Sequence, residues 1–246
     1  MMELWTSPTP NGWKVTIMLE ELIEAGIDIG EFDVRVINLS KGEQFAPDFV
    51  ERNPNQKIPT LRDDGRDVIE SCAILQYLAE KHPTDLLPLD ERKWDVLPWL
   101  FWQAANVGPV FGNKLSYTRY MNDVPDAEKR HPLERFNNEA LRLVSVMDRK
   151  LGDSPWLCGE HFTIADIACY PWLRGYKWSK VDITTRPRVL EWVDRVRARP
   201  GVERGLAHGV PKDEIDRWSK ERRASYAAGG STIADNRNVR NSIDTD

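Results

Sequence analysis

Residues 5–15 carry side chains that could hold an anionic sulfur atom. Pro8 and Pro10 fix their own φ angles, and each disfavours a helical conformation for the residue before it, so Thr9 should stay extended. We expect Asn11 to be the N-cap of a helix, because apolar residues recur at helical spacing after it. The unpaired N–H groups of that helix would point back at Thr9 and Asn11. The stretch therefore predicts a thiolate-binding turn, and an ordinary capped turn is the alternative.

The run Lys57-Ile58-Pro59 could bind an extended peptide. A cis Ile58–Pro59 bond would turn the backbone N–H and C=O of Ile58 outward at a strand edge, where a peptide can pair as an added strand. Lys57 and Gln44 could then contact a terminal carboxylate. A structural turn beside two surface polar side chains is the alternative interpretation.

Glu70 and Ser71 stand where a predicted strand meets the start of a helix. The Ser71 hydroxyl and the first-turn N–H groups can bind a carboxylate, and Glu70 can bind an ammonium group beside it. A plain N-cap is the alternative. Together with the two stretches above, however, these residues predict a site for a small zwitterionic peptide that carries a thiol.

The hydrophobic periodicity places these residues in an α/β domain. The predicted order is β-α-β-(α)-β-β-α, which is typical of a thioredoxin-like domain, here over residues 1–83. Strands are expected at 2–5, 32–37 and 67–70, and a further strand is expected to end at about residue 61. Helices are expected at 11–25, 47–52 and 71–82. Asp64-Gly65 should form the hairpin turn between the last two strands, because Asp-Gly tolerates positive φ angles.

The pattern becomes entirely helical after a linker at residues 84–90. Helices are expected at 94–110, with an interruption at Gly108-Pro109, and at 133–151, 163–172 and 187–199. Thr163 and Asp166 form a capping-box signature, which we interpret as structural. The predicted fold is thus an α/β thioredoxin-like N-terminal domain plus an all-α C-terminal domain at 90–218. Residues 219–246 have few large apolar side chains and should form a flexible or partner-draped tail.

The composition argues against several classes of function. The 39 acidic and 34 basic residues give a net charge of -5, and no predicted element is strongly basic, so we expect no nucleic-acid partner. There is neither an apolar run long enough for a membrane span nor a secretory signal, so we expect no membrane contact and a cytoplasmic location. Cys72, Cys158 and Cys169 have neither CxxC nor metal-ligand spacing, so we expect no metal and interpret all three as small core residues.

The chain resembles the glutathione S-transferase family over nearly its whole length, through Ile58-Pro59, Glu70-Ser71 and the run Phe162-Thr-Ile-Ala-Asp166. Three other runs are most similar to the bacterial Nu class and to the related class of the yeast nitrogen-regulating prion protein. These runs are Pro8-Thr-Pro-Asn-Gly12 followed by Lys14, Asn53-Pro-Asn-Gln-Lys-Ile-Pro59, and Leu100-Phe-Trp-Gln103.

The resemblance implies a glutathione-binding site and a homodimeric assembly. Thr9 and Asn11 would contact the glutathione sulfur, in the place where other classes of the family have Tyr or Ser. A homodimer is implied as well, in which Arg135 reaches the site of the partner subunit. The remainder of the tripeptide would be bound by Gln44, Lys57, Ile58, Glu70 and Ser71.

The bound thiol needs activation, because a free thiol with a pKa of about 8.5 is largely protonated at neutral pH. Its thiolate could attack an electrophilic carbon or a disulfide sulfur. Nu-class proteins are known for the second reaction, often with oxidised glutathione or two glutathiones bound. The resemblance therefore implies a disulfide reductase with weaker glutathione transferase activity. A lyase or transferase for an aromatic electrophile and a non-catalytic glutathione-binding regulator are alternatives, whereas a thioredoxin-type redox protein is disfavoured because CxxC is missing.

The pocket for the second substrate is expected at the seam between the two predicted domains. The candidate residues are Trp13, Phe101, Phe111, Lys114, Tyr117, Trp172 and Arg174. Aromatic residues at helical spacing also build cores, and that is the competing interpretation. An aryl ether, a haloaromatic compound and a peroxide all remain open as substrates.

Overall fold

A four-stranded sheet with the order β2-β1-β3-β4 forms the N-terminal part of a computed structural model, which describes residues 1–210, 221, 224–225 and 228–230. The strands are β1 (Met2–Thr6), β2 (Phe32–Val36), β3 (Thr60–Asp63) and β4 (Arg66–Ile69). Strands β1 and β2 are parallel, whereas β3 is antiparallel to both β1 and β4. This is the predicted order, with Asp64-Gly65 at the hairpin turn.

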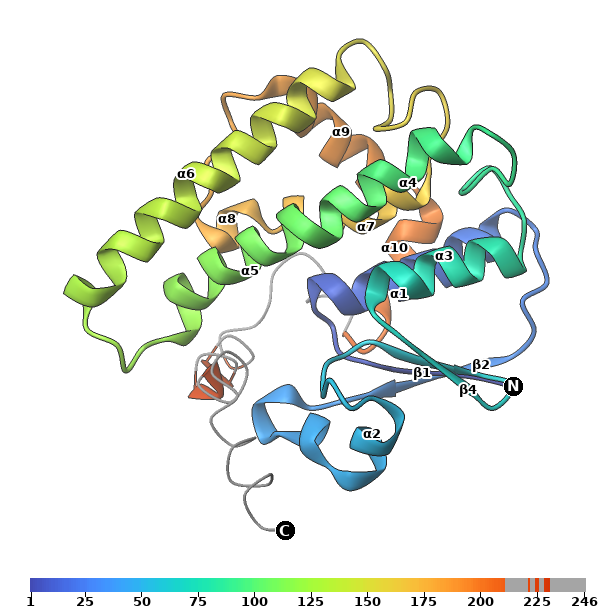
Figure 1. The fold of residues 1–246 in the computed structure, drawn as a ribbon, viewed down its shortest axis with the longest axis horizontal. Coiled ribbons are helices and arrows are strands. Elements are labelled where there is room, and N and C mark those ends of the chain that lie inside the picture. The colour runs from blue at the N-terminus through green and yellow to red at the C-terminus, as the bar shows by residue number, and fades with distance from the viewer. Residues whose placement is uncertain (211–220, 222–223, 226–227, 231–246) are drawn as a thin grey trace.

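Helices cover both faces of this sheet. They are α1 (Pro10–Glu24), α2 (Pro47–Arg52) and α3 (Ser71–Lys81). Figure 1 shows α1 and α3 on the face toward the rest of the molecule, with α2 on the opposite face. The thioredoxin-like arrangement predicted from the sequence is therefore present.

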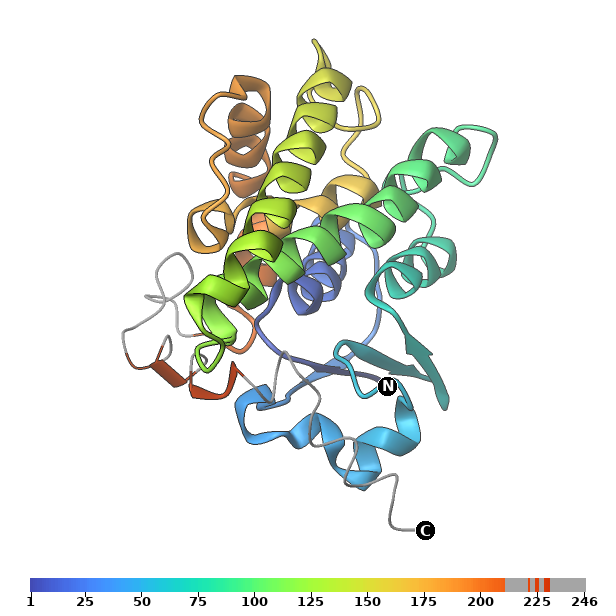
Figure 2. The same cartoon turned by 60° about the vertical axis from the view of Figure 1, so that its left-hand side comes forward.

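The second half of the described chain is helical, as predicted, and packs against the α1 and α3 side of the sheet (Figures 1 and 2). Its helices are α4 (Lys93–Trp102), α5 (Gly108–Leu115), α6 (Asp126–Leu151), α7 (Ile164–Leu173), α8 (Tyr176–Ser179), α9 (Pro187–Arg197) and α10 (Pro200–Ala207). Within the described residues, every helix is too short or too polar to cross a membrane. No group of three His, Cys, Asp or Glu side chains is placed there to hold a metal ion.

Two helical predictions were wrong, and two short helices were missed. Gly108-Pro109 does not interrupt the helix: the π-helical turn Gln103–Val107 leads directly into α5, where Pro109 lies in the first turn and its missing N–H is tolerated. Helix α6 begins at Asp126 rather than at 133, although Pro132 lies inside it. Helices α8 and α10 were not predicted, because each is only one or two turns long.

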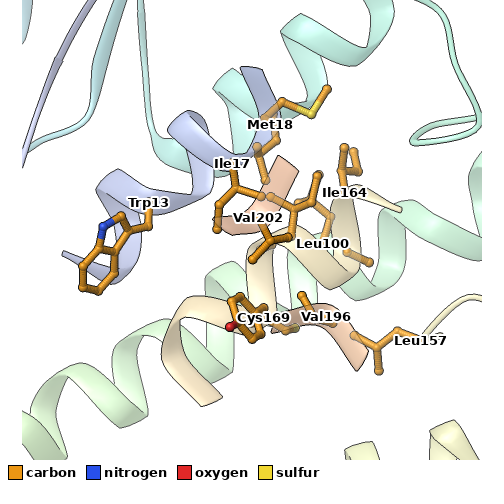
Figure 3. Close-up of a cluster of buried hydrophobic side chains, with 14 of the residues drawn as sticks. Trp13, Ile17, Met18, Leu100, Leu157, Ile164, Cys169, Val196 and Val202 are labelled. Carbon is orange, nitrogen blue, oxygen red and sulfur yellow. The ribbon is translucent and has the colours of Figure 1, made fainter. Parts of the chain in front are cut away.

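The central part of helix α1 is buried on all sides, and it joins the sheet to the helical part. All residues from Gly12 to Leu22 are buried. Helix α10 approaches α1 so closely that a Cβ atom on Gly205 would lie 2.5 Å from the Cα of Ile17, so only glycine allows this contact. Figure 3 shows Ile17 and Met18 of α1 packed among Leu100, Ile164 and Val202 from three other helices.

Most of the predicted tail, 219–246, lies outside the described residues. Two of its described residues lie against other parts of the chain. Gly229 is next to Ser40, and Gly230 is next to the backbone of Tyr120. The domain boundaries at 83 and 90 remain predictions.

The capping box at the start of α7 is present and buried. Asp166 is fully buried and accepts hydrogen bonds from the backbone N–H groups of Leu157 and Thr163, both at 3.0 Å, and from Trp192 Nε1 at 2.8 Å. Burial raises the pKa of the Asp166 carboxyl even though these donors favour its ionised form. The aspartate thus joins α7, α9 and the loop before α7.

Replacing Asp166 with Ala should lower the free energy of unfolding by at least ~3 kcal/mol, because four buried donors, the Thr163 hydroxyl among them, lose their acceptor. Asp166→Asn should cost less, because its side-chain oxygen can still accept from Leu157 and Trp192. The measurement is urea denaturation at one fixed protein concentration. Equal losses in the two variants would contradict this account of the capping box.

Candidate functional site

A cavity of about 1090 Å³ opens between the N-terminus of α1 and the helical part of the molecule. Seven of the eight residues that were predicted to contact glutathione line it, and Arg135, which was predicted to act in the partner subunit's site, does not. The seven are Thr9, Asn11, Gln44, Lys57, Ile58, Glu70 and Ser71. Residues that are far apart in sequence therefore meet at one cavity, as the combined motifs predicted.

The N-cap of α1 lies two residues earlier than predicted. Thr9, not Asn11, is the N-cap: its Oγ1 accepts from the N–H of Gly12 at 3.4 Å, and Pro10 takes the first helical position. Asn11 is consequently in the first turn. Neither its side chain nor its backbone N–H has a hydrogen-bond partner among the described residues, so both donors are free for a ligand.

Gly12 is required by the turn that precedes α1. A Cβ atom at this position would overlap the carbonyl oxygen of Ser7, and it would come within 2.5 Å of Thr6 Oγ1. The chain from Thr6 to Thr9 therefore folds back directly over the helix start. This close approach explains why glycine follows Asn11 in the sequence.

The loop before β3 presents Ile58 as expected. The Ile58–Pro59 bond is cis, and the backbone groups of Ile58 have no hydrogen-bond partner among the described residues. Asn53, which the sequence analysis did not single out as a site residue, holds this loop: its Nδ2 donates to the carbonyl of Lys57 at 2.7 Å and to Thr60 Oγ1 at 3.0 Å. Nearby, Gln44 is buried and its Oε1 lacks a partner in the described structure.

Glu70 has a backbone conformation that favours glycine. Its φ of 69° and ψ of 117° lie in a region that costs a non-glycine residue about 1–3 kcal/mol. The side chain is exposed at the cavity and accepts from Asn55 Nδ2 at 3.3 Å. A glutamate kept in such a conformation at a cavity suggests that its carboxylate has a role in binding.

Lys14 is the main residue of the cavity wall to which the sequence analysis gave no role. It is 2% exposed, and its Nζ donates to Ser71 Oγ at 3.1 Å and to Gln103 Oε1 at 2.6 Å. Cys72 was expected in the core, but it lies half-buried in the same wall, with Sγ 3.7 Å from Lys14 Nζ. Burial lowers the pKa of Lys14.

The predicted pocket for the second substrate is only partly assembled from the expected residues. Trp13, Phe111, Trp172 and Arg174 line the cavity, and the Arg174 guanidinium lies 5.0 Å from the centre of the Trp13 ring. The other three candidates do not line the cavity. Lys114 is buried, Tyr117 stacks on Phe136, and Phe101 is 61% exposed on α4.

Several residues of this wall were not predicted. They are Arg119, Tyr120, Lys177 and Trp178. Arg119 lies 4.2 Å from the centre of the Trp178 ring and donates from Nε to the Trp178 carbonyl at 3.0 Å. These residues come from short helical turns whose position depends on packing. No sequence pattern marked them.

The comparisons with known proteins agree with this geometry. The model for the glutathione S-transferase N-terminal domain matches residues 1–80, and the model for the glutathione S-transferase C-terminal domain matches residues 131–195. The chain is a member of the glutathione S-transferase family. Within that family it is similar to the disulfide-bond oxidoreductase YfcG of Escherichia coli, with 38% identity over 87% of this chain and 98% of the relative.

Crystal structures of other family members contain glutathione. A glutathione transferase family member from Pseudomonas fluorescens Pf-5, with two glutathione bound, is 36% identical and has a TM-score of 0.76 over 83% of this chain and 91% of that one. A glutathione transferase from Pseudomonas putida has one glutathione disulfide bound per subunit. It is 33% identical, with a TM-score of 0.74 over 84% of this chain and 90% of that one. These likenesses support the Nu-like group within the glutathione S-transferase family.

Replacing Glu70 with Gly should leave the melting temperature unchanged or higher, because glycine removes the backbone strain. If Glu70 binds the ammonium group of glutathione as the sequence analysis expects, the affinity for glutathione should fall by roughly tenfold or more in this variant. Thermal unfolding and calorimetric titration measure the two effects. Asp64→Gly is the matched control: Asp64 has a φ of 48° in the β3–β4 turn and does not line the cavity. An unchanged affinity in Glu70→Gly would contradict the binding role.

Proposed function

We propose that this protein binds glutathione in the cavity, ionises its thiol at the N-terminus of α1 and uses the thiolate to reduce disulfides. The observation that carries the proposal is the pair of free donors on Asn11 beside the Thr9 hydroxyl, all at the cavity. The name of the relative that is 38% identical, a disulfide-bond oxidoreductase, supports this reaction.

The energy needed for thiol activation is small. Lowering a thiol pKa by one unit requires about 1.4 kcal/mol of preferential stabilisation of the thiolate. One charge-assisted hydrogen bond can supply that amount, and the positive end of α1 adds to it. Thr9 Oγ1 already accepts from Gly12, and as a donor it makes only a long hydrogen bond to the Ser7 carbonyl oxygen, 3.4 Å from Oγ1. The hydroxyl proton can turn to a bound sulfur.

The charge of the cavity suits glutathione, which carries two carboxylates and one ammonium group. The charged side chains among its described lining residues are Lys14, Lys57, Arg119, Arg174, Lys177 and Glu70. Cations prevail in this cavity although the whole chain is acidic. This local excess favours anionic ligands such as glutathione and its disulfide.

The proposed reaction needs two molecules of glutathione. A first glutathione thiolate attacks the disulfide of the substrate, which forms a mixed disulfide and releases one substrate thiolate. A second glutathione thiolate attacks the glutathione sulfur of the mixed disulfide, which releases the second substrate thiolate and leaves glutathione disulfide. The relative with two glutathione bound and the one with glutathione disulfide support both stages.

Transfer of glutathione to an aromatic electrophile is the second candidate activity. Phe111, Tyr120 and Trp172 line the side of the cavity that faces the helical part. Such a wall can hold a flat apolar substrate next to the thiolate. A non-catalytic regulator would bind glutathione without either reaction.

We also propose that the protein is a cytoplasmic homodimer. Helix α4 has an exposed apolar face that contains Trp94, Pro98 and Phe101, and the first and last of these are 59% and 61% exposed. Large exposed aromatic residues on one face are typical of a protein interface. Arg135 is exposed on α6, outside the cavity of its own subunit, so its proposed role is in the site of the partner.

The decisive assay is glutathione-dependent reduction of 2-hydroxyethyl disulfide. Asn11→Ala and Thr9→Ala should each lower kcat/KM at pH 7 by about 10- to 100-fold, because a donor to the thiolate is removed. The pKa of the bound thiol should rise in both variants, so activity should recover as the pH is raised. Conjugation to an activated chloronitrobenzene tests the transferase alternative.

Cys72→Ala is the control, because Cys72 is the cysteine that lines the cavity. Cys158 and Cys169 are poor candidates for a nucleophile: burial raises the pKa of Cys158 to about 12 and that of Cys169 well above its usual value. Cys72→Ala should retain reductase activity. Loss of activity in this variant would indicate a protein thiol and would contradict the proposal, and binding without turnover in the wild type would indicate a regulator.

A charge on the exposed face of α4 should weaken the dimer. Phe101→Arg should shift the molecule toward the monomer by at least ~10-fold in dissociation constant, because the interface would have to bury an unpaired cation. Sedimentation velocity over a range of concentrations measures this shift. Ile23→Arg is the control, since Ile23 is 41% exposed on α1 and lies outside the α4 face. A wild-type monomer, or an unchanged dimer in Phe101→Arg, would contradict the proposed interface.

A further inference from the structure

The Lys14 ammonium is a buried cation without an anionic partner among the described residues. Its three donors are directed at neutral groups: Ser71 Oγ at 3.1 Å, Gln103 Oε1 at 2.6 Å and Cys72 Sγ at 3.7 Å. No carboxylate lies within 4.0 Å of it in that part of the chain. A charge taken out of water with only neutral partners is costly, so a protein gains nothing in stability from such a lysine.

The two buried acids of α1 are each paired with an arginine. Glu21 is 3% exposed and binds Arg199 at 2.6 Å, and Glu20 is 9% exposed and binds Arg204 at 2.8 Å. Both glutamates lie on α1, as Lys14 does. The same helix therefore compensates its buried acids and leaves its buried base uncompensated.

Lys14 is also part of the cavity wall, beside Ser71 and Gln103. Ser71 Oγ accepts from Lys14, so the hydroxyl proton of Ser71 must point elsewhere. Ser71 is the first residue of α3, where the backbone N–H groups have no helical acceptor. The hydroxyl proton and these N–H groups can all be offered to one carboxylate, with the ammonium directly behind them.

We propose that Lys14 is the positioning residue for the α-carboxylate of the γ-glutamyl end of glutathione, acting through Ser71. The inference rests on the proposed function and adds the residue that supplies the counter-charge. Lys14 orients the Ser71 hydroxyl and stabilises the bound carboxylate without touching it. The ligand's anion thus compensates a charge that the protein leaves unpaired.

Gln103 keeps the lysine in place. Its Oε1 accepts from Lys14 and, at 3.1 Å, from the Cys72 thiol, so the amide oxygen is fixed toward the ammonium. Gln103 is 0% exposed and lies at the start of the π-helical turn that links α4 to α5. The helical part of the molecule therefore helps to fix a group that acts on a site in the thioredoxin-like part.

The test is calorimetric binding of two ligands, glutathione and its analogue that lacks the γ-glutamyl α-carboxylate, to Lys14→Met. Affinity for glutathione should fall roughly 10- to 100-fold, whereas affinity for the analogue should change less than about twofold. In the disulfide assay KM for glutathione should rise while kcat stays nearly constant. The melting temperature should not fall, because an unpaired buried charge has been removed.

Two further variants complete the test. Lys14→Gln keeps hydrogen bonds but removes the charge, and it should reproduce the loss for glutathione. Lys81→Met is the control: Lys81 lies on α3 and pairs with Asp63 outside the cavity, so this variant should lose stability but keep its affinity.

Equal losses for glutathione and for the analogue would overturn the proposal, since Lys14 would then not act on the carboxylate. Unchanged affinity for glutathione, or failure of both Lys14 variants to fold, would overturn it too. If the wild type does not bind glutathione at all, the proposed function fails instead, so the two failures are distinguishable.

Discussion

Burial of α1 on every side is the constraint on which the rest of this structure depends. A helix at the surface of a protein can turn its charged residues to water, but α1 cannot, because Gly12 through Leu22 are all buried. Each polar residue on it must therefore find a partner inside the protein or in a ligand. Glu20 and Glu21 reach Arg204 and Arg199 of the helical part, at 2.8 Å and 2.6 Å. These ion pairs couple the helical part to the sheet.

The same burial explains the position of the cavity. Helix α1 is enclosed from Gly12 to Leu22, and its N-terminus opens on the cavity, where Thr9 caps the helix and the donors of Asn11 stay free. The positive end of the helix is then the part that a ligand can reach, and its field is only weakly screened there. In the proposed function, a thiolate is stabilised by geometry that the fold already needs. No side chain of the protein has to act as a nucleophile.

The residues around the thiolate site are held by interactions that do not involve a ligand. Asn53 fixes the loop that carries Ile58, and Asn55 donates to Glu70. Lys14 holds Ser71 from inside the protein. A site arranged in this way loses little conformational entropy when it binds a small peptide. Pre-organisation of this kind suits a catalyst whose nucleophile belongs to a diffusible cosubstrate.

The sequence by itself determined the thioredoxin-like order of strands and helices, because that order follows from local periodicity and turn chemistry. It also identified Thr9, Asn11, Glu70 and Ser71 as cavity residues, since each stands at a helix start where donors are unpaired. The sequence analysis was wrong about two features that depend on how the helices pack. It placed the N-cap at Asn11, and it interrupted a continuous helix at Gly108-Pro109.

Only the tertiary structure decided which residues meet across long distances in the chain. Lys14 contacts Gln103, which lies 89 positions away, and α10 lies against α1 because Gly205 has no side chain. No local pattern encodes such contacts, since periodicity reports which face of an element is apolar but not what covers it. The position of Lys14 behind Ser71, and the cations Arg119, Arg174 and Lys177 across the cavity, both depend on tertiary packing. Neither arrangement could therefore be predicted from the sequence alone.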